Sequence, residues 1–215
     1  MEYAIELEWT TEFKVLNFFK EWANRTPAWS DHKKPVGTWA VVHPDTFKKI
    51  ECLTDLNEKF KNHGFIIHDG VLRTVNPRQF TGIHTDSVMA SDGTNVPLSL
   101  SLNIPIENQS EATTYWYDLS KNSVFANEET REGLISTDSI FRKVVEHQLI
   151  DSALECVKFS LRMSKPVLIN TGIPHNVDMR YSRVKRTILS LHLRDLTTNK
   201  MLGWEDRHRV LEIRF

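Results

Sequence analysis

The chain has 215 residues, of which 40% are hydrophobic and 26% are charged, and its 28 acidic and 27 basic side chains give a formal net charge of −1 at pH 7. These values are those of an ordinary globular protein. A near-neutral chain is unlike a duplex-DNA binder held by a large basic face. The two cysteines form no CxxC pair, which excludes a disulfide scaffold and a cysteine-based metal site.

We expect one domain over residues 1–215, because no linker and no repeat divides the chain. Residues 1–63 are expected to form a helical or mixed N-terminal support, 64–195 the β core and 196–215 a C-terminal tail. The N-terminus lacks the basic and apolar stretches of a secretory signal, and no apolar run reaches the roughly 18 residues of a membrane span. A cytoplasmic protein of bacterial or viral (phage) origin is therefore expected.

Two helices and one strand are expected before residue 64. Thr10 or Thr11 caps a helix running to about Asn24, which brings four apolar residues close to one face: Phe13, Leu16, Phe19 and Trp22. Residues 37–43 (GTWAVVH) form a short buried strand. Pro44 and Asp45 open a second helix through about Asn62, and Gly64 ends it.

Short strand-like segments dominate from residue 65 onward. They are 65–67, 71–75, 82–84, 98–106, 113–117, 157–162, 166–170, 175–179 and 187–193. In residues 98–106 (LSLSLNIPI) leucines and isoleucines share one face, while Ser99, Ser101 and Asn103 share the other. Such closely spaced strands predict a sandwich or barrel. The expected fold class is mainly β with flanking helices, the N-terminal helices being packed on an antiparallel double-sheet core. The tail from Trp204 favours helix.

Several common catalytic motifs do not occur. The chain has no GxGxxG, GxxxxGK[ST], GxSxG or HExxH sequence. Readings as a dinucleotide-binding protein, a P-loop nucleotide-binding protein, an elbow-type hydrolase or a zincin therefore lose their usual support.

Two HxD triplets are candidate metal-ligand pairs. His43-Pro44-Asp45 lies where a strand passes into a helix, so Asp45 is expected to interact with the helix N-terminus. His84-Thr85-Asp86 lies in a β region, where residues two apart point to the same side. The imidazole and the carboxylate of the second triplet can therefore coordinate one metal ion together.

A third ligand can come from His175, which opens a strand about 90 residues downstream (IPHNV). Strands that distant in sequence can be neighbours in an antiparallel barrel. Two histidines and one carboxylate are the facial triad of non-haem iron(II) oxygenases, which leaves coordination positions open. The alternative is that His84 and His175 are satisfied structural histidines.

Arg186 is a candidate anion-binding residue. It immediately precedes the alternating strand TILSLHL, and its guanidinium fork can bind the far carboxylate of a dicarboxylate in a bidentate manner. Arg183 and Lys185 lie close by and compete for this role.

These segments, in their order, resemble the iron(II)/2-oxoglutarate-dependent oxygenases, in particular small stand-alone enzymes of bacteria and phages. The segments are GIHTD, LSLSLNIPI, TTYWY, PVLINTGIPHNV and KRTILSLHL, within residues 80–193. The resemblance implies a double-stranded β-helix (jelly-roll) core and catalytic iron(II) ligands at His84, Asp86 and His175. It also implies 2-oxoglutarate as cosubstrate, bound through Arg186, and dioxygen as oxidant.

Further site residues follow from the resemblance. Asn103 can reach a carboxylate or the substrate, or instead satisfy backbone beside Pro105, and Thr114 or Tyr115 can donate to 2-oxoglutarate. Segments 87–96 and 121–138 are candidate lids. The expected reaction is hydroxylation of a small-molecule or peptidyl substrate, with no membrane partner and no pattern typical of nucleic-acid binding. The alternatives are a non-catalytic jelly-roll binding module and a cupin-like metal enzyme without 2-oxoglutarate.

Overall fold

The computed structural model describes residues 2–8, 11–25, 37–79, 81, 83–89, 95–108, 111–118 and 154–213. Within these residues, a six-stranded sheet has the order β1-β9-β6-β11-β3-β2, a three-stranded sheet has the order β10-β7-β8, and β4 pairs with β5. Paired strands are antiparallel throughout. The strands are β1 (Ala4–Glu6), β2 (Gly37–Val42), β3 (Phe65–Val75), β4 (Ser87–Met89), β5 (Asn95–Pro97), β6 (Ser101–Glu107), β7 (Thr113–Tyr117), β8 (Val157–Leu161), β9 (Val167–Ile169), β10 (His175–Asp178) and β11 (Arg186–Asp195).

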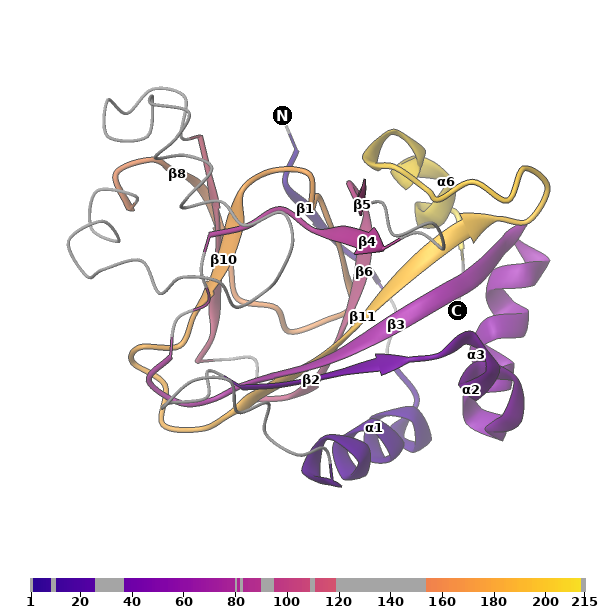
Figure 1. The fold of residues 1–215 in the computed structure, drawn as a ribbon, viewed down its shortest axis with the longest axis horizontal. Coiled ribbons are helices and arrows are strands. Elements are labelled where there is room, and N and C mark those ends of the chain that lie inside the picture. Colours follow the sequence, from indigo (N-terminus) through magenta and orange to yellow (C-terminus); the bar gives the residue numbers. More distant parts are fainter. Residues whose placement is uncertain are drawn as a thin grey trace.

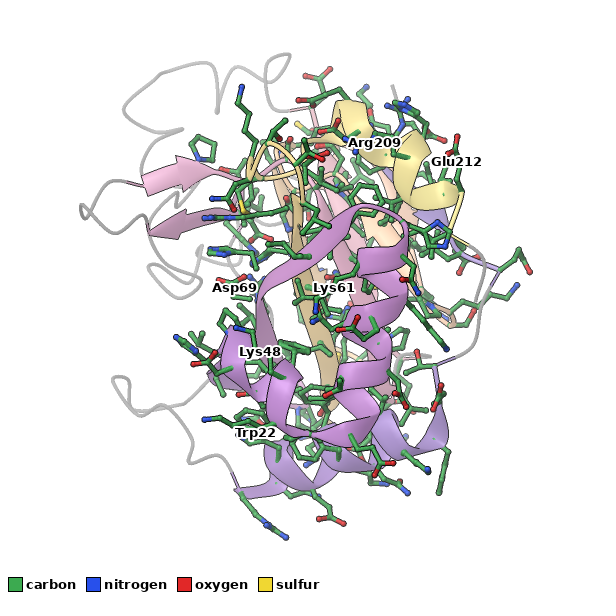
Figure 2. The ribbon with its side chains drawn as sticks, turned by 90° about the vertical axis from the view of Figure 1, so that its right-hand side faces the viewer. Trp22, Lys48, Lys61, Asp69, Arg209 and Glu212 are labelled. Carbon is green, nitrogen blue, oxygen red and sulfur yellow. The ribbon has the colours of Figure 1, made fainter. Side chains whose placement is uncertain are left out.

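The helices and the smaller sheet lie on opposite sides of the six-stranded sheet (Figure 1). Helices α1 (Phe13–Arg25), α2 (Pro44–Lys49) and α3 (Glu51–Asn62) pack on the outer face, and Figure 2 looks onto this helix layer. The main apolar core fills the space between helices and sheet. The observed fold class is therefore mainly β with flanking helices, as the sequence predicts.

The buried face of α1 differs from the one expected. Val15, Phe19 and Ala23 are buried, whereas Phe13 is 74% exposed. These three residues are spaced four apart and so form one stripe along the helix. The apolar residue at the helix start therefore lies outside the contact with the sheet.

The expected second helix is broken at Ile50, which has extended backbone angles and separates α2 from α3. The Thr54 hydroxyl, 3.2 Å from the Phe47 and Ile50 carbonyl oxygens, bonds to the groups that the break leaves exposed. Helix α3 ends as predicted, because Gly64 follows it with a φ of +83° that favours glycine.

Residues 65–75 form one continuous strand rather than the two pieces expected. Gly70 lies within it, and a side chain there would meet Leu191 Cδ2 at 3.1 Å and Phe47 Cζ at 3.3 Å. The glycine therefore lets α2 approach the sheet closely instead of ending the strand. A register shift opposite His192 and Leu193 leaves His68 as the extra residue of a bulge.

Other strand predictions need correction. Of the expected strand 82–84, Ile83 and His84 belong to no strand, since His84 makes only an isolated bridge with His175, and residue 82 lies outside the described residues. Residues 87–89 and 95–97, expected within a loop, form the β4–β5 pair, and β1 was not expected at all. The C-terminal tail contains a 3₁₀ turn (Trp204–Asp206) and α6 (Arg207–Leu211), which confirms its helical character. In the described part of the chain, none of the helices has the length and apolarity needed to cross a membrane.

Strand β11 is buried on both faces. Leu189, Leu191 and Leu193 pack into the core under the helices, while Arg186, Ile188 and Ser190 line a cavity between the two sheets. The same alternation in β6 places Leu102 and Ile104 toward the helices and Asn103 toward the cavity. The period-two pattern thus separates core from cavity, rather than core from solvent.

Replacing Leu191 with alanine is expected to lower the free energy of unfolding by about 2–5 kcal/mol. Leu191 is fully buried between the sheet and the helix layer, so truncation leaves a cavity. Leu196→Ala is the control, because Leu196 is 50% exposed, and it should change stability by less than about 0.5 kcal/mol. Denaturant unfolding followed by circular dichroism measures both. Equal stability of the two variants would contradict this packing.

Candidate metal centre

His84 and His175 are held side by side by the backbone. The amide of each donates to the carbonyl oxygen of the other at 2.9 Å, forming the antiparallel bridge between the His84 segment and β10. Residues paired in this way project their side chains to the same side. The two imidazole rings are accordingly 4.6 Å apart between centroids.

Asp86 completes a buried group of three. Its Oδ1 lies 3.5 Å from His84 Nε2, and one potential ligand atom from each of His84, Asp86 and His175 lies within 4.8 Å of the others. Within the described ranges, no other three His, Cys, Asp or Glu side chains bring ligand atoms so close. Two imidazole nitrogens and one carboxylate oxygen form a donor set suited to iron(II).

His175 is held in the tautomer that a metal requires. Its Nδ1 lies 2.9 Å from the Ile173 carbonyl oxygen, which can only accept, so Nδ1 carries the proton and Nε2 keeps its lone pair. Burial lowers the pKa of His175, although the charge of Asp86 partly opposes this effect. The imidazole therefore stays neutral below its ordinary titration range. The Trp116 ring, stacked on His175 with centroids 6.2 Å apart, fixes its plane.

Asp86 is a buried carboxylate that remains ionised. Burial by itself raises its pKa, but the charges of Arg73, His175 and His84 outweigh this effect and hold the pKa below the usual range. Arg73 Nη2, from β3, lies 3.5 Å from Asp86 Oδ1. The carboxylate is thereby both charged and oriented, as a metal ligand must be.

Arg186 lines the same cavity as His84 and His175. The cavity lies between the two sheets, because its walls come from β3, β6, β7, β9, β10 and β11. Much of the wall is apolar, with Val75, Ile169, Val177 and Ile188 among the lining residues. A cavity with metal-ligating groups, apolar walls and a guanidinium suits a short dicarboxylate.

The Arg186 guanidinium is buried, and its Nη2 contacts Met163 Sδ at 3.4 Å. Burial, together with the charge of Arg73, lowers the pKa of Arg186 to about 9. An anion bound in the cavity would offset both effects and stabilise the charged form.

The two competitors of Arg186 lie elsewhere. Arg183 is exposed, and its backbone amide donates to Glu111. Lys185 Nζ bonds to Asn24 Oδ1 and lies 3.9 Å from Glu107 Oε2. Of the three basic residues, Arg186 alone lines the cavity.

Asn103 and Thr114 also line the cavity and are buried. Asn103 Oδ1 accepts a hydrogen bond from the Ser101 hydroxyl at 3.2 Å rather than from backbone beside Pro105. Trp116 and Tyr117 are core residues: the indole Nε1 donates to the Asn170 carbonyl, and the phenol donates to Asn176 Oδ1.

The first HxD triplet has the structural role expected of it. His43 precedes α2, and Asp45 lies in the first turn of this helix, 3.3 Å from Lys48 Nζ. Both His43 and Asp45 are exposed. The two triplets thus differ in burial and in neighbours, although their sequences look alike.

One candidate lid follows directly from the metal centre. Asp86 immediately precedes β4, Leu98 immediately follows β5, and the Leu98 amide donates to the Asp86 carbonyl at 2.9 Å. The β4–β5 hairpin therefore begins and ends beside Asp86. The other candidate lid, 121–138, lies outside the described residues.

Arg73 was not predicted from the sequence, although a signal was present. It is the only charged residue in the expected strand 71–75 (VLRTV), and a charge between apolar strand residues often faces an internal site. The face of β11 that carries Arg186, Ile188 and Ser190 continues to His192, which is also buried. The sequence pattern TILSLHL contains His192, but nothing in that pattern marks it as a site residue.

Comparison with known proteins finds similarity only at the level of structure. No protein-family model matches the sequence, and no curated protein sequence matches it. An iron-bound structure of HygX from Streptomyces hygroscopicus aligns over 89% of this chain and 81% of its own, with 9% identity and a TM-score of 0.50.

Two enzymes of nogalamycin biosynthesis are similar to the same degree. The non-haem α-ketoglutarate (2-oxoglutarate)-dependent carbocyclase SnoK aligns over 96% of this chain and 85% of its own, at 11% identity and a TM-score of 0.50. The epimerase SnoN, also non-haem and α-ketoglutarate-dependent, aligns over 90% and 79%, at 9% identity and a TM-score of 0.50. The chain therefore shares the fold of these enzymes, which confirms the jelly-roll prediction.

Proposed function

We propose that this protein is a non-haem iron(II)/2-oxoglutarate-dependent oxygenase that hydroxylates a small-molecule or peptidyl substrate. One observation carries the proposal: the ligand atoms of His84, Asp86 and His175 come within 4.8 Å of one another, and both histidines line a cavity that Arg186 also lines. The shared fold of HygX, SnoK and SnoN is consistent with it. Fold alone does not define chemistry, so the proposal rests on the site.

The donor set fits iron(II), which would supply the dioxygen chemistry when bound. In the overall reaction, 2-oxoglutarate, dioxygen and a substrate R–H give succinate, carbon dioxide and R–OH. One oxygen atom of dioxygen enters succinate and the other enters the substrate. 2-Oxoglutarate supplies two electrons through loss of its C1 carboxylate, and the substrate supplies the other two.

The protein residues bind and orient the reactants. His84, Asp86 and His175 would hold the metal ion through two imidazole nitrogens and one carboxylate oxygen. Arg186 binds the distal carboxylate of 2-oxoglutarate, while the apolar walls exclude water from the chain between the two carboxylates. Asn103 and Thr114, which also line the cavity, would hydrogen-bond the bound acid.

An anaerobic titration tests this proposal. Iron(II) and then 2-oxoglutarate are added to metal-free protein, and we expect the visible charge-transfer band of the iron(II)–2-oxoglutarate chelate. The band should disappear in His175→Ala and weaken in Arg186→Ala. Iron binding without a band would favour a metal enzyme that does not use 2-oxoglutarate. Absence of iron binding would instead favour a non-catalytic binding module.

A further inference from the structure

His192 presents an unused hydrogen-bonding atom beside the metal centre. Its Nδ1 lies 2.5 Å from Asp69 Oδ1, across the β11–β3 pair. Burial tends to raise the pKa of Asp69, but the hydrogen bond to His192 and the electrostatic effects of His192, His68 and Arg194 together lower it, so the carboxylate is ionised and accepts. Nδ1 therefore donates to Asp69, and when the imidazole carries this single proton its Nε2 is an acceptor.

The free acceptor is buried. His192 is 2% exposed, and no described residue forms a hydrogen bond with its Nε2. The neighbouring His68 and Arg194 bond to each other instead, with His68 Nε2 3.3 Å from Arg194 Nη2. A buried acceptor without a donor is destabilising, and a bound donor group would recover that free energy.

Strand alternation places His192 on the same face of β11 as the residues that line the cavity. Arg186, Ile188 and Ser190 line the cavity, and His192 is the next residue on that face, before the register shift that follows it. His192 is also near enough to Asp86 to act electrostatically on that carboxylate. In Figure 2, Asp69 lies to the left of α3, on the side of the molecule that carries the β4–β5 hairpin.

Arg186 and His192 flank the metal centre along β11. They are six positions apart along the strand, which is about 20 Å at ~3.4 Å per residue, too far for one five-carbon dicarboxylate to bridge. Between them, Ile188 pairs with Arg73, whose guanidinium contacts Asp86. Asp86 therefore contacts a residue paired with the middle of this face of β11, between Arg186 and His192.

We infer that His192 binds the substrate, accepting a hydrogen bond from a hydroxyl or amine of that molecule, and that Asp69 is a positioning residue that fixes the imidazole tautomer. The inference rests on the proposed function, because it takes the Arg186 end as the cosubstrate end. It assigns the substrate class: a molecule that carries a donor group beside the carbon to be oxidised.

The test uses alcohols paired with their methyl ethers, which keep the oxygen but lose the donor. The probes are cyclohexanol, benzyl alcohol and 2-phenylethanol with their methyl ethers, followed by ligand-observed NMR on the zinc(II)- and 2-oxoglutarate-loaded protein and on metal-free protein. We expect the alcohols to bind about fivefold to tenfold more tightly, the worth of one hydrogen bond. His192→Phe should remove this preference and His192→Gln should keep part of it, while the exposed control His208→Phe should leave it unchanged.

A second readout concerns the tautomer. In ¹⁵N spectra of the metal-free protein, His192 should carry its proton on Nδ1, and Asp69→Leu should give a mixture of tautomers with a weaker alcohol preference. Protonation on Nε2, or no alcohol preference in the wild-type protein, overturns the inference. Weaker 2-oxoglutarate binding in His192→Phe also overturns it, by assigning the residue to the cosubstrate. The charge-transfer titration judges the proposed function separately.

Discussion

Asp86→Ala is expected to weaken iron(II) binding at least about 100-fold, because loss of an outer-shell partner alone costs 10–100-fold and a direct ligand contributes more. Iron-dependent formation of succinate from 2-oxoglutarate should fall with it. Asp86 is the only carboxylate in the group of three, so the two histidines that remain lack the negative charge that balances the cation.

The chain provides a matched control for this experiment. Asp45→Ala removes the carboxylate of the other HxD triplet, which is exposed and lies beside Lys48. We expect unchanged iron binding and succinate formation in this variant. Asp86→Asn, which preserves shape, separates loss of the ligand from loss of packing, and circular dichroism verifies that each variant folds. Undiminished iron binding in both Asp86 variants would refute the assignment.

Arg186→Met is expected to raise the Kd of 2-oxoglutarate about 100-fold or more while leaving iron(II) binding intact. Two charge-assisted hydrogen bonds to a carboxylate are worth at least about 1.5 kcal/mol each, and every 1.4 kcal/mol is a factor of ten. Methionine fills a similar volume next to Met163, so the cavity wall is preserved. The amplitude of the charge-transfer band at increasing 2-oxoglutarate concentration measures the Kd.

Arg183→Met is the corresponding control, because Arg183 is exposed and does not line the cavity. We expect its 2-oxoglutarate affinity to match that of the wild-type protein. Arg186→Lys should give an intermediate value, since an ammonium group keeps the charge but loses the planar fork. A larger effect from Arg183→Met than from Arg186→Met would contradict the prediction and assign the carboxylate-binding role to Arg183.

Local sequence patterns predicted the structure correctly where the residues of a single strand or helix end determine it. The period-two alternation of residues 98–106 and 187–193 predicted strands, and Gly64 marked the end of α3. Local sequence patterns did not predict the bounds of elements that depend on packing between elements. Ile50 breaks a helix without glycine or proline, and Gly70 lies inside a strand because Phe47 and Leu191 require the space of a side chain.

The sequence by itself determined most of the core strands, the class of fold and the identity of His84, Asp86, His175 and Arg186 as candidates, because alternation, spacing and residue chemistry are local properties. Only the tertiary structure decided which of the two HxD triplets is buried and which basic residue faces the cavity. It also brought Arg73 to Asp86 and Asp69 to His192. These contacts depend on pairing between strands distant in the chain, and the register of that pairing is set by the whole sheet.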